Sequence, residues 1–495
     1  MHTENYKPSY PRPRKFDRNL IVIGAGSGGL VAAYIAAAVK AKVTLIEKHK
    51  MGGDCLNTGC VPSKALIRSA RFIAQSRRAQ EFGFDSARLE FDFSRIMQRV
   101  QNVIAKIEPH DSIERYTKLG VEIIEGQARL CSPYAVEVNG QTLTARTIII
   151  ATGARPTIPA IPGLDKLEYL TSDSVWRLRE LPKRLLVLGG GPIGCELAQS
   201  FARFGVESDS KVIMVQRGSR LMSREDEEVS AYVARQFKDE GIDLRLTHRP
   251  KCFKQEGNRK ILVAEHAGKE VEIEFDQLLV ALGRSANISG FGLEELGVKI
   301  SARNTIEVNT FLQTNYPNIY ACGDVAGPYQ FTHVAAHQAW YASVNALFSP
   351  FKKFRVDYSV IPFATFTDPE VARVGLNEQQ ANAQGMAYEV TSYELDDLDR
   401  AITDSEAHGF IKVLTVPGKD KILGATIVGE HAAELIAEFV SAMRHNLGLN
   451  KILSTIHIYP TWSEANKYVA GNWKKSHVPV QLLHWVARFH AWRRR

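Results

Sequence analysis

The chain has 495 residues, of which 45% are hydrophobic and 23% charged, and this length leaves room for about two to four globular domains. Its formal net charge of +8 comes from the two ends, because residues 1–18 and 474–495 are rich in Lys and Arg while the body between them is close to neutral. A basic nucleic-acid-binding face on the body is therefore not supported. Six cysteines are too few for the disulfide framework of a secreted protein, so we expect a reducing, cytoplasmic compartment.

The N-terminal segment 1–18 contains three prolines among polar side chains and is predicted to be a flexible arm. The apolar stretch that follows, residues 20–39, has the length of a signal peptide or a membrane span. Four glycines lie close together near its start, however, and they fit a phosphate-binding loop better than a membrane segment.

A strand, a glycine fingerprint, a helix and a second strand then follow in the order of a dinucleotide-binding fold. The fingerprint glycines are Gly24, Gly26 and Gly29, and the second strand ends in Glu47. The glycines permit a tight turn and a close approach of the backbone to a pyrophosphate, while the acid can bind ribose hydroxyls. The sequence therefore predicts a site for an adenine dinucleotide.

Two cysteines, Cys55 and Cys60, come directly after this unit and are separated by four residues. A regular helix would separate residues five positions apart by about 7.5 Å along its axis, so a disulfide between them requires an irregular turn. Residues 58–59 and Pro62 predict a bend and then a helix start, where the helix dipole favours a thiolate. We interpret the pair as a redox-active disulfide. The alternative is a structural or zinc-binding pair, for which only His49 is a further nearby ligand.

A second dinucleotide-binding unit repeats the pattern with Gly189, Gly191 and Gly194. Its second strand ends in Gln216 and Arg217 in place of an acid. A carboxylate would repel a 2′-phosphate, whereas a guanidinium binds it, so NADPH is favoured and NADH is the alternative. Arg220 follows closely, and the competing interpretation is that these two arginines belong to a solvated loop.

Three buried strands end in turns of small residues. These turns contain Thr152 and Gly153, then Gly283, and finally Gly323 followed by Asp324, an acid suited to hold the ribityl chain of a flavin. Because the last of these strands follows the second unit, we expect the first domain to be discontinuous.

We predict an α/β fold with two Rossmann-type domains and a C-terminal α+β domain. The predicted segments are the arm 1–18, the first dinucleotide domain 19–155 and 285–350, the second dinucleotide domain 156–284, the α+β domain 355–475 and a basic amphipathic tail 476–495.

Six segments together resemble the class I pyridine nucleotide-disulfide oxidoreductases over residues 19–475. They are GGDCLNTGCVPSK, the two glycine fingerprints, YACGDVAG, TFTDPEVARVG and YPTWSE. The resemblance implies that FAD binds the first domain, with Lys48, Gly53 and Asp324 among its contacts, and that NAD(P)H binds the second. It also implies a homodimer formed through the C-terminal domain.

The resemblance further implies a role for each residue of the redox centre. Cys60 faces the flavin as the charge-transfer thiolate, and Cys55 exchanges with the acceptor. Lys64 lies near flavin N5, and Glu196 pairs with it, because a buried ammonium needs a counter-charge.

One position distinguishes members of this family. Those that reduce disulfides have a histidine as proton shuttle five residues before Glu464, whereas this chain has Tyr459 there, as mercuric reductase does. A tyrosine with a reference pKa near 10 is a poor base at neutral pH. We therefore expect a mercuric reductase-like enzyme with a small-molecule, metal-thiol or disulfide acceptor.

Other observations leave alternatives open. The last cysteine is Cys322, and no C-terminal cysteine pair or N-terminal metal-binding domain is present, which counts against efficient detoxification of Hg(II). His457 is an alternative base or, more simply, a hydrogen-bonded packing residue. Glu464 and Thr461 have capping-box spacing, so Glu464 is also expected to cap a helix.

Two rival functions follow from these features. One is a dihydrolipoyl dehydrogenase-like or other low-molecular-weight disulfide reductase. The other is a membrane-associated electron-transfer partner, because Leu482, Val486, Phe489 and Trp492 form a helical stripe that ends in arginines and suits an anionic membrane surface. A tail helix docked on the dimer, or a frayed end, is the simpler alternative for this segment.

Overall fold

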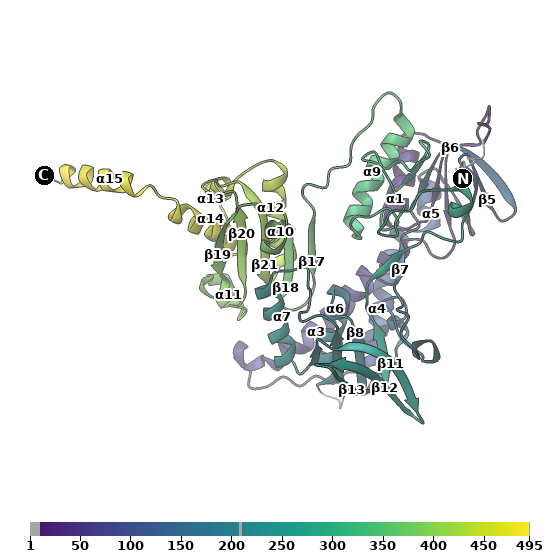
Figure 1. The fold of residues 1–495 in the computed structure, drawn as a ribbon. Coiled ribbons are helices and arrows are strands. Elements are labelled where there is room, and N and C mark those ends of the chain that lie inside the picture. Colours follow the sequence, from purple (N-terminus) through teal and green to yellow (C-terminus); the bar gives the residue numbers. More distant parts are fainter. Residues whose placement is uncertain (1–9, 207–209, 495) are drawn as a thin grey trace.

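The computed structural model describes residues 10–206 and 210–494, and Figure 1 shows three regions built on separate sheets. The first dinucleotide-binding region contains the N-terminus, the second lies beside it, and the C-terminal region is followed by a helix that extends away from the body. The predicted α/β fold class is confirmed.

The first region is organised around a seven-stranded sheet in the order β3-β2-β1-β6-β5-β4, with β16 pairing to β6. Its central strands pair in parallel, and their apolar runs are buried on both faces, as is typical of a parallel sheet covered by helices. The strands are β1 (Arg18–Ile23), β2 (Val43–Glu47), β3 (Val121–Glu125), β4 (Arg129–Ser132), β5 (Ala135–Val138), β6 (Gln141–Ile150) and β16 (Ile319–Ala321).

Two helices of this region, α1 and α9, pack against each other and against the sheet. The small side chains of α1 permit the close contact, because Ala32, Ala33 and Ala36 are completely buried. The helices of this part of the chain are α1 (Ser27–Ala38), α2 (Gly53–Asn57), α3 (Cys60–Arg77), α4 (Phe93–Ile107), α5 (Ile113–Lys118), α8 (Leu293–Leu296) and α9 (Thr332–Phe348). Of these, α3 and α4 pack against α6 (Pro192–Gly205) of the second region.

The predicted N-terminal arm is described only from residue 10 onward, and residues 1–9 lie outside the described part of the chain. Tyr10 packs against the core of the first region. The carboxylate of Asp17 accepts hydrogen bonds from the backbone N–H and the hydroxyl of Thr144. Residues 10–17 therefore contact the first sheet rather than leaving the body.

The second region has a four-stranded parallel sheet in the order β10-β9-β8-β14, with a three-stranded antiparallel sheet, β11-β12-β13, packed against it. A short pair, β7 and β15, joins it to the first region. Its elements are β7 (Ala154–Pro156), β8 (Arg184–Leu188), α6 (Pro192–Gly205), β9 (Lys211–Gln216), α7 (Glu227–Asp239), β10 (Asp243–Leu246), β11 (Arg249–Glu256), β12 (Arg259–His266), β13 (Lys269–Phe275), β14 (Gln277–Val280) and β15 (Arg284–Ala286).

The C-terminal region is a five-stranded antiparallel sheet in the order β17-β18-β21-β20-β19, against which α12 and α14 pack. Its elements are β17 (Pro362–Thr365), β18 (Glu370–Gly375), α10 (Glu378–Ala383), β19 (Glu389–Glu394), α11 (Asp399–Thr403), β20 (Phe410–Thr415), β21 (Ile422–Gly429), α12 (Ala432–Arg444), α13 (Leu449–Ser454) and α14 (Glu464–Ser476).

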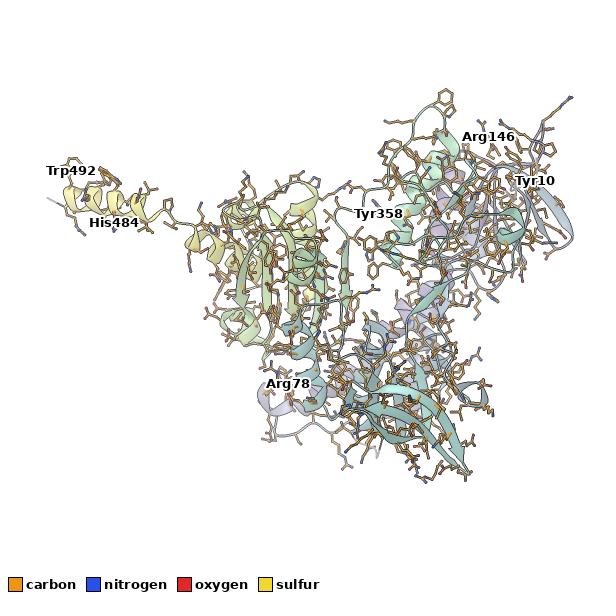
Figure 2. All side chains as sticks on the ribbon, in the orientation of Figure 1. Tyr10, Arg78, Arg146, Tyr358, His484 and Trp492 are labelled. Carbon is orange, nitrogen blue, oxygen red and sulfur yellow. The ribbon has the colours of Figure 1, made fainter. Side chains whose placement is uncertain are left out.

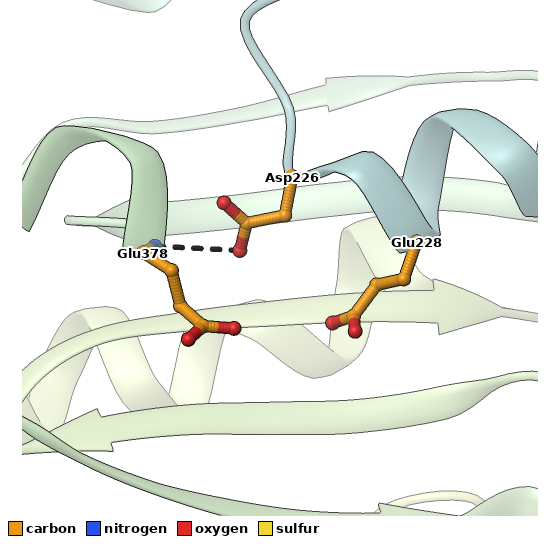
Figure 3. Close-up of side chains that lie close together, drawn as sticks. All are labelled: Asp226, Glu228 and Glu378. Atoms are coloured by element: carbon orange, nitrogen blue, oxygen red, sulfur yellow. Dashed lines mark hydrogen bonds between the residues drawn. The ribbon is translucent and has the colours of Figure 1, made fainter. Parts of the chain in front are cut away.

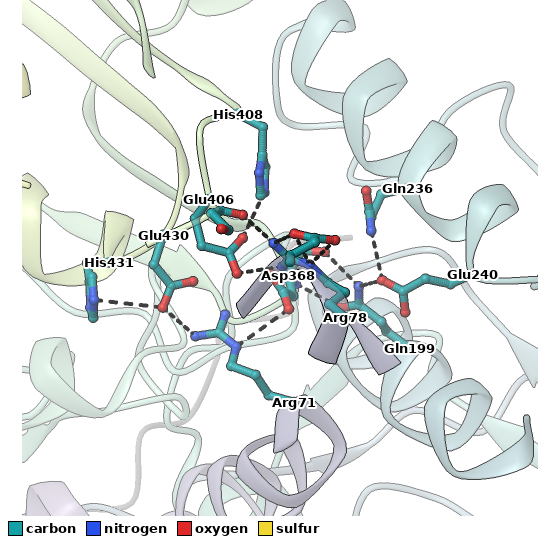
Figure 4. A network of polar contacts seen from close by, with 12 residues as sticks. Arg71, Arg78, Gln199, Gln236, Glu240, Asp368, Glu406, His408, Glu430 and His431 are labelled. Atoms are coloured by element: carbon teal, nitrogen blue, oxygen red, sulfur yellow. Dashed lines mark hydrogen bonds and ion pairs between the residues drawn. The ribbon is translucent and has the colours of Figure 1, made fainter. Parts of the chain in front are cut away.

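A network of ion pairs joins helix α3 to the C-terminal region (Figure 4). Arg71 lies 3.0 Å from Glu430, and Arg78 lies 2.6 Å from Glu406. Since α3 begins at Cys60, these contacts help to fix the direction of the helix that carries one of the two predicted redox cysteines.

Three carboxylates converge between α7 and the C-terminal region, those of Asp226, Glu228 and Glu378 (Figure 3). The ammonium group of Lys412 lies among them, 2.6 Å from Asp226 and 2.9 Å from Glu378, and it also pairs with Glu228. Burial alone would lower the pKa of Lys412, but the hydrogen bonds to these acids raise it overall. The cluster is therefore a buried charge link between two regions.

Helix α15 (Val480–Arg493) ends the described chain and has no buried side chain. Figure 2 shows His484 and Trp492 on this helix, well away from the three sheets. Within residues 10–206 and 210–494, no helix combines the length and the apolar character needed to cross a membrane.

Candidate active site

One cavity of about 2870 Å³ runs between the first two regions and reaches the C-terminal region. A pocket for one small ligand has a volume of roughly 300–1,000 Å³. This cavity is several times larger and can therefore hold more than one dinucleotide. Most predicted site residues line it: Cys55, Cys60, Lys64, Glu196, Gly24, Gly26, Glu47, Lys48, Gly53, Thr152, Gly153, Gly189, Gly191, Gln216, Gly283, Gly323 and Asp324.

The first glycine fingerprint leaves no space for side chains where the backbone segments cross. A Cβ atom on Gly29 would lie 1.7 Å from the carbonyl oxygen of Gly24, and one on Gly53 would lie 2.6 Å from the Cα of Gly26. Gly26 is also the N-cap residue of α1, which places the start of that helix against the cavity. This is the cradle that a pyrophosphate requires.

Glu47 holds the end of β2 against the fingerprint loop. Its carboxylate accepts hydrogen bonds from the backbone N–H groups of Ala25, at 2.6 Å, and His49, at 2.8 Å. The acid thus lies in the cavity wall beside the fingerprint, where the ribose of an adenine dinucleotide would lie.

Asp324 and Arg284 are half-buried polar side chains that also line the cavity. Burial raises the pKa of Asp324 to about 6, although the guanidinium of Arg284 opposes this shift. The Nε of Arg284 is buried without a hydrogen-bond partner, and its Nη2 lies 3.0 Å from Asp54. A carboxylate and a donor that lack full partners fit the hydroxyl-rich ribityl chain of a flavin.

The turn at Thr152 and Gly153 connects the first region to β7. The Thr152 hydroxyl donates to the carbonyl of Asn287, and the Asn287 side-chain amide donates to the carbonyl of Thr152. The backbone N–H of Thr157 donates to the carbonyl of Gly283. These contacts hold both chain connections between the first and second regions beside the cavity.

The second fingerprint repeats the geometry of the first. A Cβ on Gly194 would lie 2.1 Å from the carbonyl oxygen of Gly189, so the same close approach is required. The side-chain oxygen of Gln216 accepts from the backbone N–H of Gly190 at 3.2 Å, in the way that Glu47 accepts from Ala25. Gln216 therefore occupies the position that Glu47 has in the first unit, but its side chain carries no charge.

Arg217 is exposed on the loop after β9 and does not line the cavity. Arg220, on the same loop, is half-buried, and its backbone carbonyl accepts from the Gln216 side chain. Neither arginine lines the cavity, and both belong to the loop that follows Gln216.

The predicted redox cysteines lie on either side of the irregular turn. Cys55 is in α2, and Cys60 is the first residue of α3, so the prediction of a bend followed by a helix start is confirmed. Both are thiols in this structure. Cys60 Sγ also lies 3.5 Å from the hydroxyl oxygen of Thr332, the first residue of α9.

The two thiols differ in acidity. The hydrogen bond from Cys55 lowers the pKa of Cys60 to about 6, and Thr332 and the charge of Lys64 act in the same direction. The same hydrogen bond, together with burial, raises the pKa of Cys55. At neutral pH the reduced pair therefore carries its thiolate on Cys60 and its proton on Cys55.

Lys64 lies one turn along α3 from Cys60, and groups from two other regions hold it. Its Nζ lies 2.9 Å from Glu196 Oε2 of α6 and 4.2 Å from the ring centre of Phe366. The other oxygen of Glu196 accepts from the backbone N–H of Phe366 at 2.9 Å. The predicted Lys64–Glu196 pair is therefore present in this structure.

Tyr459 lies outside the cavity of its own chain. Its side chain is 65% exposed, and its hydroxyl donates to Asp399 at 2.9 Å. This hydrogen bond raises the pKa of Tyr459 above the ordinary tyrosine value. The phenol is thus protonated at neutral pH, and it is exposed at the surface of this chain.

His457 and Glu464 also lie outside the cavity. The ring nitrogens of His457 are hydrogen-bonded to the carbonyl of Thr455 and to the carboxylate of Glu438, which favours the packing interpretation over a catalytic base. Glu464 is buried at the start of α14 and accepts from the backbone N–H of Thr461 at 3.4 Å. This contact is one half of the predicted capping box.

The sequence interpretation missed two residues that contact the redox centre, Thr332 and Phe366. Thr332 contacts Cys60, and Phe366 contacts both Lys64 and Glu196. Both come from segments remote in sequence; Phe366 belongs to the TFTDPEVARVG segment, but no role was predicted for it, and Thr332 has no local motif.

Comparisons with known proteins agree with this architecture. The family described as "Pyridine nucleotide-disulphide oxidoreductase" matches residues 18–339, and its dimerisation domain matches residues 361–470. The chain is 34% identical to a mercuric reductase of Bacillus cereus over 452 residues, 91% of this chain and 71% of that protein. It is 36% identical to a dihydrolipoyl dehydrogenase of Chlamydia muridarum over 450 residues, 90% of this chain and 94% of that protein.

Two solved structures have the same fold. The HOCl-induced flavoprotein disulfide reductase RclA from Escherichia coli has a TM-score of 0.81 at 28% identity, covering 92% of this chain and 99% of that chain. LpdA from Mycobacterium tuberculosis has a TM-score of 0.82 at 26% identity, covering 91% and 99%.

Proposed function

Because the chain belongs to the pyridine nucleotide-disulphide oxidoreductases, whose members use FAD and NAD(P)H, we propose that it is a mercuric reductase-like enzyme that oxidises NADPH. NADPH supplies two electrons and one proton as a hydride, and these reduce the Cys55–Cys60 disulfide to one thiol, on Cys55, and one thiolate, on Cys60. The reduced pair then passes its electrons to a small acceptor, for which we propose a thiol-bound soft metal ion. Bound FAD supplies the two-electron carrier between NADPH and the disulfide.

The protein's own groups prepare the cysteine pair for this reaction. Lys64 places its positive charge beside Cys60 and favours the thiolate. Glu196 holds Lys64 in position, and Cys55 keeps the proton that Cys60 releases. The pair therefore offers one thiolate and one thiol, and a soft metal ion binds such sulfur ligands strongly.

Tyr459 is the observation that carries the choice of acceptor. In disulfide-reducing members a histidine at this position shuttles a proton, but Tyr459 is held protonated by Asp399 and is a poor base. A metal ion needs ligands more than it needs a proton shuttle. The rival function, a dihydrolipoyl dehydrogenase-like or other low-molecular-weight disulfide reductase, would need another base.

We propose that Tyr459 acts at the cysteine pair of the other subunit of a homodimer. The loop that carries it exposes 95% of Ile456 and 77% of Ile458, an apolar surface that suits burial against a second copy. The match of residues 361–470 to the dimerisation domain supports the same assembly.

For the nicotinamide cofactor we propose NADPH rather than NADH. Gln216 replaces the acid that would repel a 2′-phosphate, and Arg217 and Arg220 lie on the same loop. The alternative, that these arginines are only solvated, predicts equal use of the two cofactors.

The test is anaerobic oxidation of NADPH by the pure, FAD-loaded protein. Hg(II) in excess thiol is compared with lipoamide and with oxidised glutathione. Turnover with Hg(II) alone supports the proposal, and turnover with a disulfide but not with Hg(II) overturns it in favour of the rival.

Helix α15 supports a second candidate function, electron transfer to a membrane-associated partner. Trp485 and Trp492 are each 69% exposed and Phe489 is 51% exposed, and residues 474–495 carry six Lys and Arg and no acid. Such a helix suits an anionic membrane surface. If a chain truncated after Val478 co-sediments with anionic vesicles as strongly as the full chain, α15 has no part in membrane binding.

A further inference from the structure

The segment directly after α9 exposes both apolar rings and basic side chains. We call residues 348–355, with the sequence Phe-Ser-Pro-Phe-Lys-Lys-Phe-Arg, the aromatic–basic loop. Phe351 at its centre is 94% exposed, and Phe348 and Trp340 beside it are 43% and 42% exposed. A ring as exposed as Phe351 makes little packing contact within the chain.

Three cations flank Phe351, and none of them has an ion-pair partner among residues 10–206 and 210–494. Lys352 Nζ lies 4.8 Å from the ring centre of Phe354. Lys353 and Arg355 lie 5.6 Å and 5.5 Å from the ring centre of Phe311. The aromatic faces position the cations at the surface, and their charges remain available to an anionic partner.

Buried hydrogen bonds set the conformation of the aromatic–basic loop. Asn345 is completely buried, and its side chain accepts from the backbone N–H of Phe354 at 2.7 Å and donates to the Phe354 carbonyl at 2.8 Å. It also donates to the carbonyl of Phe311 at 3.1 Å. These hydrogen bonds attach the loop to helix α9 and to the segment of Phe311. The exposure of Phe351 is therefore set by the fold.

The aromatic–basic loop lies away from the chemistry of the cysteine pair. Helix α9 begins at Thr332, which contacts Cys60, and ends at Phe348. Its 17 residues span roughly 25 Å. The loop is therefore at the far end of this helix, in the connection that leads to β17 (Figure 1).

We propose that the aromatic–basic loop binds the surface of an anionic phospholipid membrane. Phe351 enters the interface between headgroups and acyl chains, while Lys352, Lys353 and Arg355 pair with lipid phosphates. A ring that is 94% exposed, beside three cations with no ion-pair partner among the described residues, matches this environment, in which apolar and anionic groups lie a few ångströms apart. The loop is separate from α15, so this inference holds whether or not α15 binds a membrane.

The test is co-sedimentation of the FAD-loaded protein, truncated after Val478, with vesicles of phosphatidylcholine alone or mixed with phosphatidylglycerol. The truncation removes α15, so that any binding belongs to the body of the protein. We expect binding to the anionic vesicles only, weakened by added salt. Replacing Lys352, Lys353 and Arg355 together by Gln should lower the affinity roughly 100-fold, at about tenfold or somewhat less for each cation.

The matched control replaces three exposed lysines elsewhere, Lys106, Lys166 and Lys238, by Gln, which removes the same charge from other surfaces. We expect this control to bind like the parent. A second variant, Phe351→Ala, keeps every charge and should lower the affinity about tenfold, because the loss of a buried ring is worth one to a few kcal/mol. The flavin absorbance and the native mass check that every variant is folded.

Two outcomes would overturn the proposal. One is an absence of binding by the truncated parent, which would leave an acidic protein surface as the better partner. The other is equal loss of affinity in the triple Gln variant and in the matched control, which would show only a response to net charge.

Discussion

Lys64 Nζ lies 2.9 Å from Glu196 Oε2, and this ion pair joins the helix that begins at Cys60 to the first helix of the second dinucleotide-binding region. Phe366 of the C-terminal region contacts both members. Three parts of the chain thus meet at one ammonium group beside the redox cysteines. The position of this charge depends on α3, α6 and the segment of Phe366. The contribution of each segment can therefore be tested without changing the cysteines.

Replacing Glu196 with Gln should slow the reduction of bound FAD by NADPH. The substitution keeps an acceptor for the Phe366 N–H but removes the counter-charge of Lys64. A hydrogen bond to a charged group is worth about 1.5–3 kcal/mol, so we expect a loss of roughly 10- to 100-fold in the rate measured by anaerobic stopped flow.

Glu240→Gln is the matched control for this variant. Glu240 pairs with the buried Arg203 at 2.7 Å but does not line the cavity. The control should leave the rate within about twofold, and a Glu196→Gln enzyme as fast as the parent would show that this pair does not position Lys64.

Replacing Tyr459 with His should give the enzyme activity toward disulfides. A histidine has a reference pKa near 6.5 and can exchange a proton at neutral pH, which is worth roughly 100-fold or more in rate. Turnover with lipoamide and oxidised glutathione is the measurement. Tyr459→Phe keeps the ring without a base and should show no gain, and if the His variant also shows none, the explanation based on the missing base is wrong.

Replacing Gln216 with Glu should shift the preference from NADPH toward NADH. The added carboxylate would face the 2′-phosphate, and the repulsion should raise the KM for NADPH about tenfold or more while changing that for NADH little. Steady-state kinetics with both cofactors measure this. Arg235→Gln, an exposed site on α7, is the control for a general change in charge.

Replacing Glu370 with Gln should stabilise the protein at neutral and alkaline pH. Burial raises the pKa of Glu370 from 4.5 to about 7. Between pH 4.5 and about pH 7, Glu370 keeps its proton in the folded protein but has lost it in the unfolded chain. The free energy of unfolding therefore falls as the pH rises through this range. Gln does not ionise, so the variant does not lose this stability. The difference in the free energy of unfolding is at most about 3 kcal/mol above pH 7.

Thermal unfolding at a series of pH values measures this difference. The melting temperatures of parent and variant should agree near pH 4 and separate by several degrees above pH 7. A separation that does not depend on pH would mean that the ionisation of Glu370 is not its cause.

The parts of this protein that the sequence could predict are those with a local signal. The strands that end in Glu47 and Gln216 were predicted because an apolar run follows the helix of each fingerprint, and both strands end at the predicted residue. The start of α3 at Cys60 followed from the bend before it and Pro62 after it. The pairing of Lys64 with Glu196 came from family resemblance and not from any local pattern.

The remaining contacts depend on segments that only the fold brings together. Thr332 contacts Cys60 although 272 residues separate them, and nothing near Thr332 in the sequence indicates a thiolate. His457 could not be assigned from its sequence position, because its packing depends on Glu438 of helix α12. Sequence patterns therefore located the cysteines and the cofactor folds, while the tuning of the cysteines needed the structure.

The most direct test of the account is the long-wavelength absorption of the two-electron-reduced, FAD-loaded enzyme, compared with that of the Cys60→Ser variant. If Cys60 is the thiolate beside the flavin, the parent should show a thiolate-to-flavin band above about pH 6, and the variant should lack it at every pH. A band that survives in the Cys60→Ser enzyme would contradict the assignment of Cys60 and the order of electron transfer built on it.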